Sequence, residues 1–136
     1  MDKKDFEAKL LKEFPFLYAD IYGSPQETSM SFGLEIGPGW YDIVYRLSQT
    51  LERLIMLEPE EERTNYRMAQ CKEKFGTLRV YMEGCTEEMA MAVHKAEADS
   101  AITCEDCGAP GKRKNGGWIR TLCDDCSDKW DKKRKL

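Results

Sequence analysis

Four cysteines near the C-terminus are the residues whose types and spacing best suit chemistry. Two residues separate Cys104 from Cys107 and Cys123 from Cys126, and fifteen residues lie between the two pairs. Two intervening residues let a tight turn point both sulfurs at one ion, and this separation between pairs is typical of two-turn zinc sites. Gly108 supplies the permissive backbone that such a turn often needs. The spacing therefore predicts a four-cysteine Zn²⁺ site, with buried or disulfide-bonded cysteines as the alternative.

The predicted zinc ion has a structural role. Four thiolates complete a tetrahedral shell and leave no position for a reactive water. The one histidine, His94, lies in an expected helix away from the cysteines, and no glycine-rich phosphate loop or nucleophile elbow occurs. An enzyme that uses Asp42 or Glu73 with an added metal remains an alternative, but such carboxylates are mostly surface charges. We therefore expect no enzyme.

Composition and charge are typical of a cytoplasmic protein. The 136-residue chain is 34% charged with a net charge of −4, and it has neither an apolar run of about 18 residues nor an apolar signal core. The charge is uneven, because residues 1–100 carry −7 and residues 101–136 carry +3. The remaining cysteines, Cys71 and Cys85, lie in strand-like surroundings and are expected in the core. We expect no contact with membranes.

The fold class expected is α+β, with a small body of helices and a β-hairpin over residues 1–101. Apolar periodicity and turn signals predict helices over residues 2–14, 39–58 and 86–101. Alternating residues around Gly76 predict a hairpin of strands 66–71 and 77–83. Residues 16–22 and 30–36 are each expected to be a short strand or an extended segment.

Residues 102–136 are expected to form a zinc-ribbon-like module with a basic tail. Residues 112–117 have the composition of a polar loop at a hairpin tip, and residues 118–122 that of a strand leading into the second cysteine pair. No linker rich in glycine and serine precedes the module, so we expect it to dock on the body.

Candidate partner-binding residues fall in two regions. Trp40 and Tyr41 follow the rigid Gly37-Pro38-Gly39 turn and could form a binding surface, although Trp40 could instead pack at the start of the core helix. Basic residues with aromatic neighbours favour nucleic acid, against the alternative of solvated loops and a frayed tail. These residues are Lys72, Lys74 and Arg79 in the hairpin and Lys112, Arg113, Lys114, Trp118, Arg120 and tail residues 132–135 in the module.

Three motifs in this order give the chain a family resemblance. They are Gly-Trp-Tyr-Asp at 39–42, Lys-Glu-Lys-Phe-Gly-Thr-Leu-Arg-Val-Tyr at 72–81, and Thr-Cys-Glu-Asp-Cys-Gly-Ala-Pro-Gly at 103–111 with Gly-Trp-Ile-Arg-Thr-Leu-Cys-Asp at 117–124. Over residues 37–126 the chain resembles small phage- and prophage-encoded proteins of unassigned function. Many of these have histidine at the last cysteine position, so Cys126 departs from the pattern but keeps a zinc ligand.

The resemblance implies a mobile-element accessory protein inside a bacterial cell and carries no catalytic residues. Our first expectation is therefore a non-enzymatic protein that binds a host or phage macromolecule, with inhibition of a bacterial defence or host process as a role. The second is direct nucleic-acid binding through the basic residues of the zinc-ribbon-like module.

Overall fold

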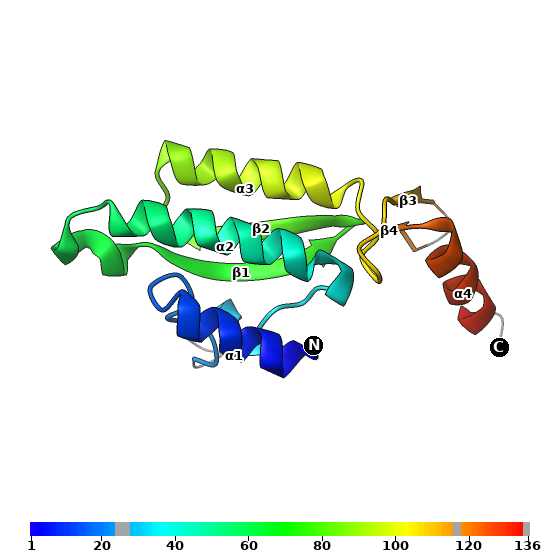
Figure 1. The fold of residues 1–136 in the computed structure, drawn as a ribbon, viewed down its shortest axis with the longest axis horizontal. Helices are drawn as coiled ribbons and strands as arrows, with labels where there is room; N and C mark the ends of the chain where they lie inside the picture. Colours follow the sequence, from blue (N-terminus) through cyan, green and yellow to red (C-terminus); the bar gives the residue numbers. More distant parts are fainter. Residues whose placement is uncertain (24–27, 116–117, 135–136) are drawn as a thin grey trace.

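The computed structural model describes residues 1–23, 28–115 and 118–134 of the chain. Helices and two small antiparallel sheets form an α+β structure with a cysteine cluster at its C-terminal end. The expected fold class is therefore confirmed. The helices of the first hundred residues gather around one hairpin, and the C-terminal elements extend beyond one end of that hairpin (Figure 1).

The hairpin consists of β1 (Arg67–Lys74) and β2 (Thr77–Glu83). Its register places Cys71 opposite Val80 and Lys72 opposite Arg79, and these successive pairs point to opposite faces of the hairpin. Met68, Cys71, Leu78 and Val80 are buried in the core. The turn contains Gly76, whose φ of 89° is a conformation that favours glycine. The predicted hairpin is confirmed, and its strands extend further than the alternation indicated.

Two helices cover the apolar face of the hairpin. α2 (Tyr41–Met56) follows the short 3-10 helix η2 (Pro38–Trp40), and α3 (Glu87–Ser100) begins where Thr86 accepts a hydrogen bond from Met89 N. Both run along the hairpin (Figure 1). The helical spacing of apolar residues explains α2, whose buried residues include Ile43, Val44, Leu47, Leu51 and Ile55. Both predicted helices are confirmed.

The N-terminal helix α1 (Lys3–Glu13) is confirmed and is capped by Asp2, but the expected strand or extended segment is wrong for residues 16–22 and for the first part of residues 30–36. Residues 16–22 form turns, because Glu52 of α2 accepts hydrogen bonds from the backbone N–H groups of Phe16 and Leu17. Within 30–36, the 3-10 helix η1 (Ser29–Phe32) is capped by Thr28, and only Glu35 pairs with a strand, beside Lys72. A further 3-10 helix, η3 (Glu60–Asn65), precedes β1.

Both edges of the hairpin have partners. On the β1 edge, Met68 N donates to Leu17 O at 2.8 Å and Glu35 lies in a parallel bridge. On the β2 edge, Leu78 N donates to Ser100 Oγ at 2.9 Å, and Val80 N donates to Glu97 Oε2 at 3.2 Å. These side chains of α3 close an edge that would otherwise be free to pair with another strand.

The C-terminal region holds β3 (Lys112–Lys114), β4 (Arg120–Leu122) and α4 (Asp124–Arg134). The expected loop at 112–117 is therefore wrong for Lys112–Lys114, which pairs with β4, while residues 116–117 lie outside the described residues. The alternative of a frayed tail is wrong up to Arg134, because these residues belong to α4. Asp124 and Asp125 in the first turn of α4 favour a helix start. None of the helices in the described residues is both long and apolar enough to cross a lipid bilayer.

Candidate metal centre

The four predicted cysteines lie together. The Sγ atoms of Cys104, Cys107, Cys123 and Cys126 are all within 4.8 Å of one another, and all four thiols are free. Cys107 Sγ is 3.7 Å from Cys123 Sγ, close to the sulfur separation of about 3.8 Å in a tetrahedral zinc site with bonds of about 2.3 Å. The donor set and its geometry therefore fit a metal ion such as zinc.

Backbone geometry positions the first pair. Gly108 N donates to Cys104 O at 2.9 Å, Cys104 N donates to Ala109 O at 2.8 Å, and Thr103 pairs with Pro110 across this turn. Gly108 has a φ of 85°, which explains why glycine follows Cys107. Cys123 directly precedes α4 and Cys126 lies in its first turn, so the second pair is set by a helix start.

Two thiols of the cluster have pKa values that are shifted in opposite directions. Burial raises the pKa of Cys104, but hydrogen bonds from the backbone N–H groups of Cys123, Cys107 and Asp106 outweigh it and lower this pKa to about 7. At Cys126, burial and neighbouring thiols raise the pKa. Four thiols this close cannot all ionise without a cation among them, and a bound metal supplies that cation.

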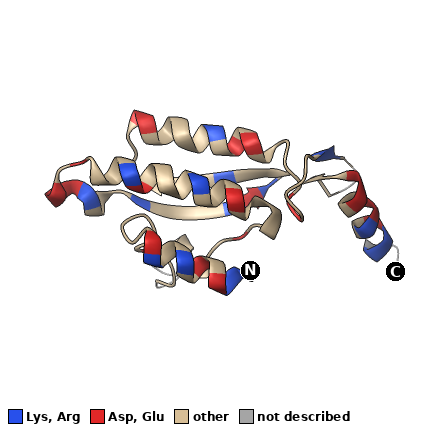
Figure 2. Cartoon of the chain, in the orientation of Figure 1, with Lys and Arg blue, Asp and Glu red and all other residues tan. Residues whose placement is uncertain are grey.

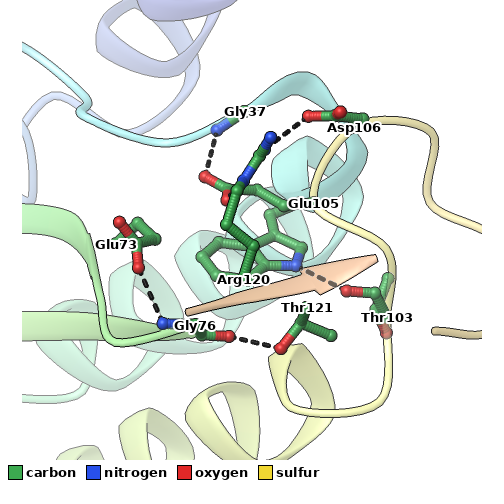
Figure 3. A network of polar contacts seen from close by, with 9 residues as sticks. Gly37, Glu73, Gly76, Thr103, Glu105, Asp106, Arg120 and Thr121 are labelled. Atoms are coloured by element: carbon green, nitrogen blue, oxygen red, sulfur yellow. Dashed lines mark hydrogen bonds and ion pairs between the residues drawn. The ribbon is translucent and has the colours of Figure 1, made fainter. Parts of the chain in front are cut away.

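The Gly37-Pro38-Gly39-Trp40 segment donates three hydrogen bonds to residues beside and between the first cysteine pair. Gly37 N donates to Glu105 Oε2 at 2.9 Å (Figure 3). Gly39 N donates to Glu105 O at 2.7 Å, and Trp40 Nε1 donates to Thr103 O at 2.8 Å. A Cβ on Gly39 would lie 2.1 Å from Cys104 O. The backbone of Gly39 therefore lies directly against the backbone of Cys104 and Glu105. The sequence did not predict this contact, and the glycine at position 39 is the one feature of the sequence that is consistent with it.

The tip of the hairpin holds the other side of the cysteine-bearing region. Thr121 Oγ1 donates to Gly76 O at 2.5 Å, and Glu73 Oε2 accepts from Gly76 N at 2.7 Å (Figure 3). Thr121 is only 1% exposed. The three motifs of the family resemblance thus meet at one place, around the first cysteine pair.

Two of the predicted partner-binding cations lie in internal ion pairs. Arg120 donates to Asp106 Oδ1 at 2.7 Å and to Glu105 Oε1 at 3.3 Å, and Lys114 lies 2.8 Å from Asp124 Oδ1. Burial raises the pKa of Glu105, although Gly37 N–H and Arg120 lower it. Lys112 and Arg113 are exposed on β3. The module's basic residues therefore do not form one free surface.

The prediction that Trp40 binds a partner is wrong. Its side chain is fully buried, so it cannot contact a partner directly, and the alternative of packing at the start of the core helix is what the structure shows. Tyr41 is half-buried and stacks on Phe6 with ring centroids 4.3 Å apart. Of the other cysteines, Cys71 is buried as expected, whereas Cys85 is exposed, and the expectation for it is wrong. His94 is exposed on α3.

Exposed aromatic rings gather beside this region. Phe75 at the hairpin turn is 63% exposed and Trp118 before β4 is 64% exposed. Both line one shallow groove with Lys74, Glu73 and Ile119. A neighbouring groove lies between Trp118 and Trp130, whose ring is 5.2 Å from the Arg120 guanidinium. Phe75 and Trp118 thus form a contiguous exposed patch, and such patches, unlike single exposed apolar residues, are typical of interaction sites.

A scan against protein-family models, a search of curated proteins and a search of solved structures each found no significant match.

Proposed function

We propose that this chain is a non-enzymatic binding protein in which a structural zinc ion at the four cysteines holds a macromolecule-binding surface in place. The observation that carries the proposal is the meeting of exposed Phe75 and Trp118 at one groove. They come from two segments that the Thr121–Gly76 hydrogen bond joins across 45 residues of chain. Large exposed rings on a rigid support are frequent contact residues in interfaces.

Zinc is the metal that the donor set favours, because four thiolates at tetrahedral separation suit Zn²⁺ and leave no catalytic position. We place the protein in a bacterial cytoplasm as a phage or prophage accessory protein, on the strength of its three motifs. Its partner in this proposal is a host or phage macromolecule, and inhibition of a bacterial defence or host process is the role proposed.

Metal content tests the first half of the proposal. We expect the purified full chain to hold about one equivalent of zinc by elemental analysis, and Cys104→Ser to lose it together with the fold of residues 102–128. Cys71→Ser changes a buried thiol outside the cluster and is the control that should keep its zinc. Full zinc content in Cys104→Ser would show that the ligand assignment is wrong.

Affinity capture from bacterial lysate, read by mass spectrometry, tests the second half. The double variant Phe75→Ala/Trp118→Ala is expected to lose a reproducible partner that the wild-type chain captures. The matched control is Phe32→Ala/Leu57→Ala, because these apolar side chains are 63% and 77% exposed elsewhere on the molecule. A protein lost equally from both variants contradicts the proposed surface, and so does a wild-type chain that captures no protein and binds no nucleic acid.

A further inference from the structure

We propose that the solvent-facing side of the β1–β2 hairpin, continued by Phe75 and Trp118, binds single-stranded nucleic acid. We call this surface the hairpin face and define it by Lys72, Lys74, Phe75, Arg79, Tyr81 and Trp118. The inference rests on the proposed binding function and names the class of partner. The sequence expectation counted the hairpin cations among the basic residues that favour nucleic acid but placed direct binding on the zinc-ribbon-like module, whereas the inference places it on the hairpin.

Strand register gathers three cations on this face. Lys72 lies opposite Arg79 and Lys74 opposite Thr77, while the alternate pair Cys71 and Val80 points into the core. Figure 2 shows basic positions on both strands towards the end that meets the cysteine-bearing region. Residues 1–100 carry a net charge of −7, so three cations on one small face are a local concentration.

These cations have no acidic partners. Among the side chains that the structure describes, no carboxylate lies within 4.0 Å of the charged nitrogens of Lys72, Lys74 or Arg79. This contrasts with Lys114 and Arg120 of the module, which both lie in ion pairs. Side-by-side cations that form no ion pair are an electrostatic match for successive phosphates.

Aromatic rings alternate with the cations. Lys72 Nζ lies 5.9 Å from the Tyr81 ring centroid and Lys74 Nζ lies 5.9 Å from that of Phe75. Tyr81 is 44% exposed, and Phe75 and Trp118 share a groove. A single strand exposes base faces next to its phosphates. Its bases can therefore stack on these rings while its phosphates bind the neighbouring cations. A duplex hides its base faces, and we therefore expect weak duplex binding.

Strand addition by a peptide is a poor fit to the same hairpin. The β1 edge pairs with Leu17 and Glu35, and α3 side chains occupy the N–H groups of Leu78 and Val80 on the β2 edge. The available surface is therefore a side-chain face and not a backbone edge. This favours recognition by charge and stacking over β-augmentation.

The test uses the zinc-loaded full chain with fluorescently labelled single-stranded DNA and RNA of mixed sequence and a DNA duplex, read by anisotropy. With three phosphate contacts, single-strand affinity is expected to fall about twentyfold between about 50 and 200 mM salt. The triple variant Lys72→Gln/Lys74→Gln/Arg79→Gln should weaken binding at least about tenfold and flatten this dependence. Phe75→Ala should weaken it about tenfold, because a stacked base is lost.

The matched control is Lys4→Gln/Lys12→Gln/Arg53→Gln, which changes the net charge equally at exposed helix positions. It should bind within about twofold of wild type. Glu35→Gln should have the opposite effect and strengthen binding, because the parallel bridge places Glu35 on the same face as Lys72. Zinc content and circular dichroism of each variant establish that its fold is intact.

Three results would overturn the inference: no single-strand binding at low salt, equal losses in both triple variants, or duplex binding as tight as single-strand binding. Capture of a protein from nuclease-treated lysate that depends on Lys72, Lys74 and Arg79, without oligonucleotide binding, would also overturn it. In that last case the proposed binding function stands and only the partner class is wrong. If neither nucleic acid nor protein binding depends on the hairpin face or on Phe75 and Trp118, both proposals fail.

Discussion

At the scale of single residues, the absence of a side chain at Gly39 allows two backbone segments to pack in direct contact. Its Cα lies against the backbone of the first cysteine pair, and a Cβ there would be 2.1 Å from Cys104 O and 2.6 Å from Glu105 C. These neighbours are backbone atoms held by their own hydrogen bonds, so they cannot move aside as a flexible side chain would. Gly39 therefore lets the start of α2 approach the turn of the first cysteine pair this closely.

We expect Gly39→Ala to separate these backbones. The added methyl group should cost about 2 kcal/mol of unfolding free energy and weaken metal binding, since overpacking of a tight contact is destabilising. Chelator competition and urea unfolding measure the two effects. Pro38→Ala, at the neighbouring position, is the control and should change either quantity little. Wild-type metal affinity in Gly39→Ala would show that the approach is not required.

At the scale of elements, local patterns predicted α1, α2, α3 and the hairpin, but they missed β3, α4 and the contacts between distant segments. The spacing of Ile43, Val44, Leu47 and Leu51 predicts α2 without reference to the rest of the chain. The bond from Trp40 Nε1 to Thr103 O spans 63 residues, and no local pattern marks it. The prediction for residues 16–22 was wrong for the same reason. Glu52, which is distant in sequence on α2, accepts hydrogen bonds from the backbone of this segment.

Glu52 is the clearest case of an element held by one side chain, since its carboxylate accepts hydrogen bonds from Phe16 N at 3.3 Å and Leu17 N at 3.0 Å. Glu52→Ala leaves both donors without this partner and should lower the unfolding free energy by about 2 kcal/mol. Arg53→Ala, at the next and exposed position of α2, should change it by less than about 0.5 kcal/mol. Urea unfolding of both variants measures the difference.

The same carboxylate gives this effect a pH dependence. Burial raises the pKa of Glu52 from its ordinary 4.5, although the two N–H donors lower it. A raised folded-state pKa adds stability as pH falls through that pKa, and this stability is lost again as pH rises. The stability difference between wild type and Glu52→Ala should therefore be larger at about pH 5 than at neutral pH. Urea unfolding at both values measures it, and an equal or smaller difference at about pH 5 would contradict the assignment.

At the scale of the whole molecule, direct hydrogen bonds join the cysteine-bearing region to the start of α2 and to the hairpin. Gly37, Gly39 and Trp40 donate hydrogen bonds to the segment of the first cysteine pair. Gly76 O accepts a hydrogen bond from Thr121 of β4 (Figure 3). Loss of metal should therefore affect more than the four cysteines. The hairpin face includes Phe75 beside this junction, so we expect its shape to change when the cysteine site loses a metal ion.

Trp40 can report this coupling. Its ring is fully buried and its Nε1 donates to Thr103 O, one residue before Cys104. In Trp118→Phe/Trp130→Phe, Trp40 is the remaining tryptophan of the three in the sequence. Chelation should shift its fluorescence emission to longer wavelength, because the unfolding turn withdraws Thr103 and admits water, and added zinc should reverse the shift. Far-ultraviolet circular dichroism should keep most of its helical signal, since α1, α2 and α3 pack around the apolar core. Unchanged emission after complete loss of zinc would show that the metal-binding turn and the core helix fold independently.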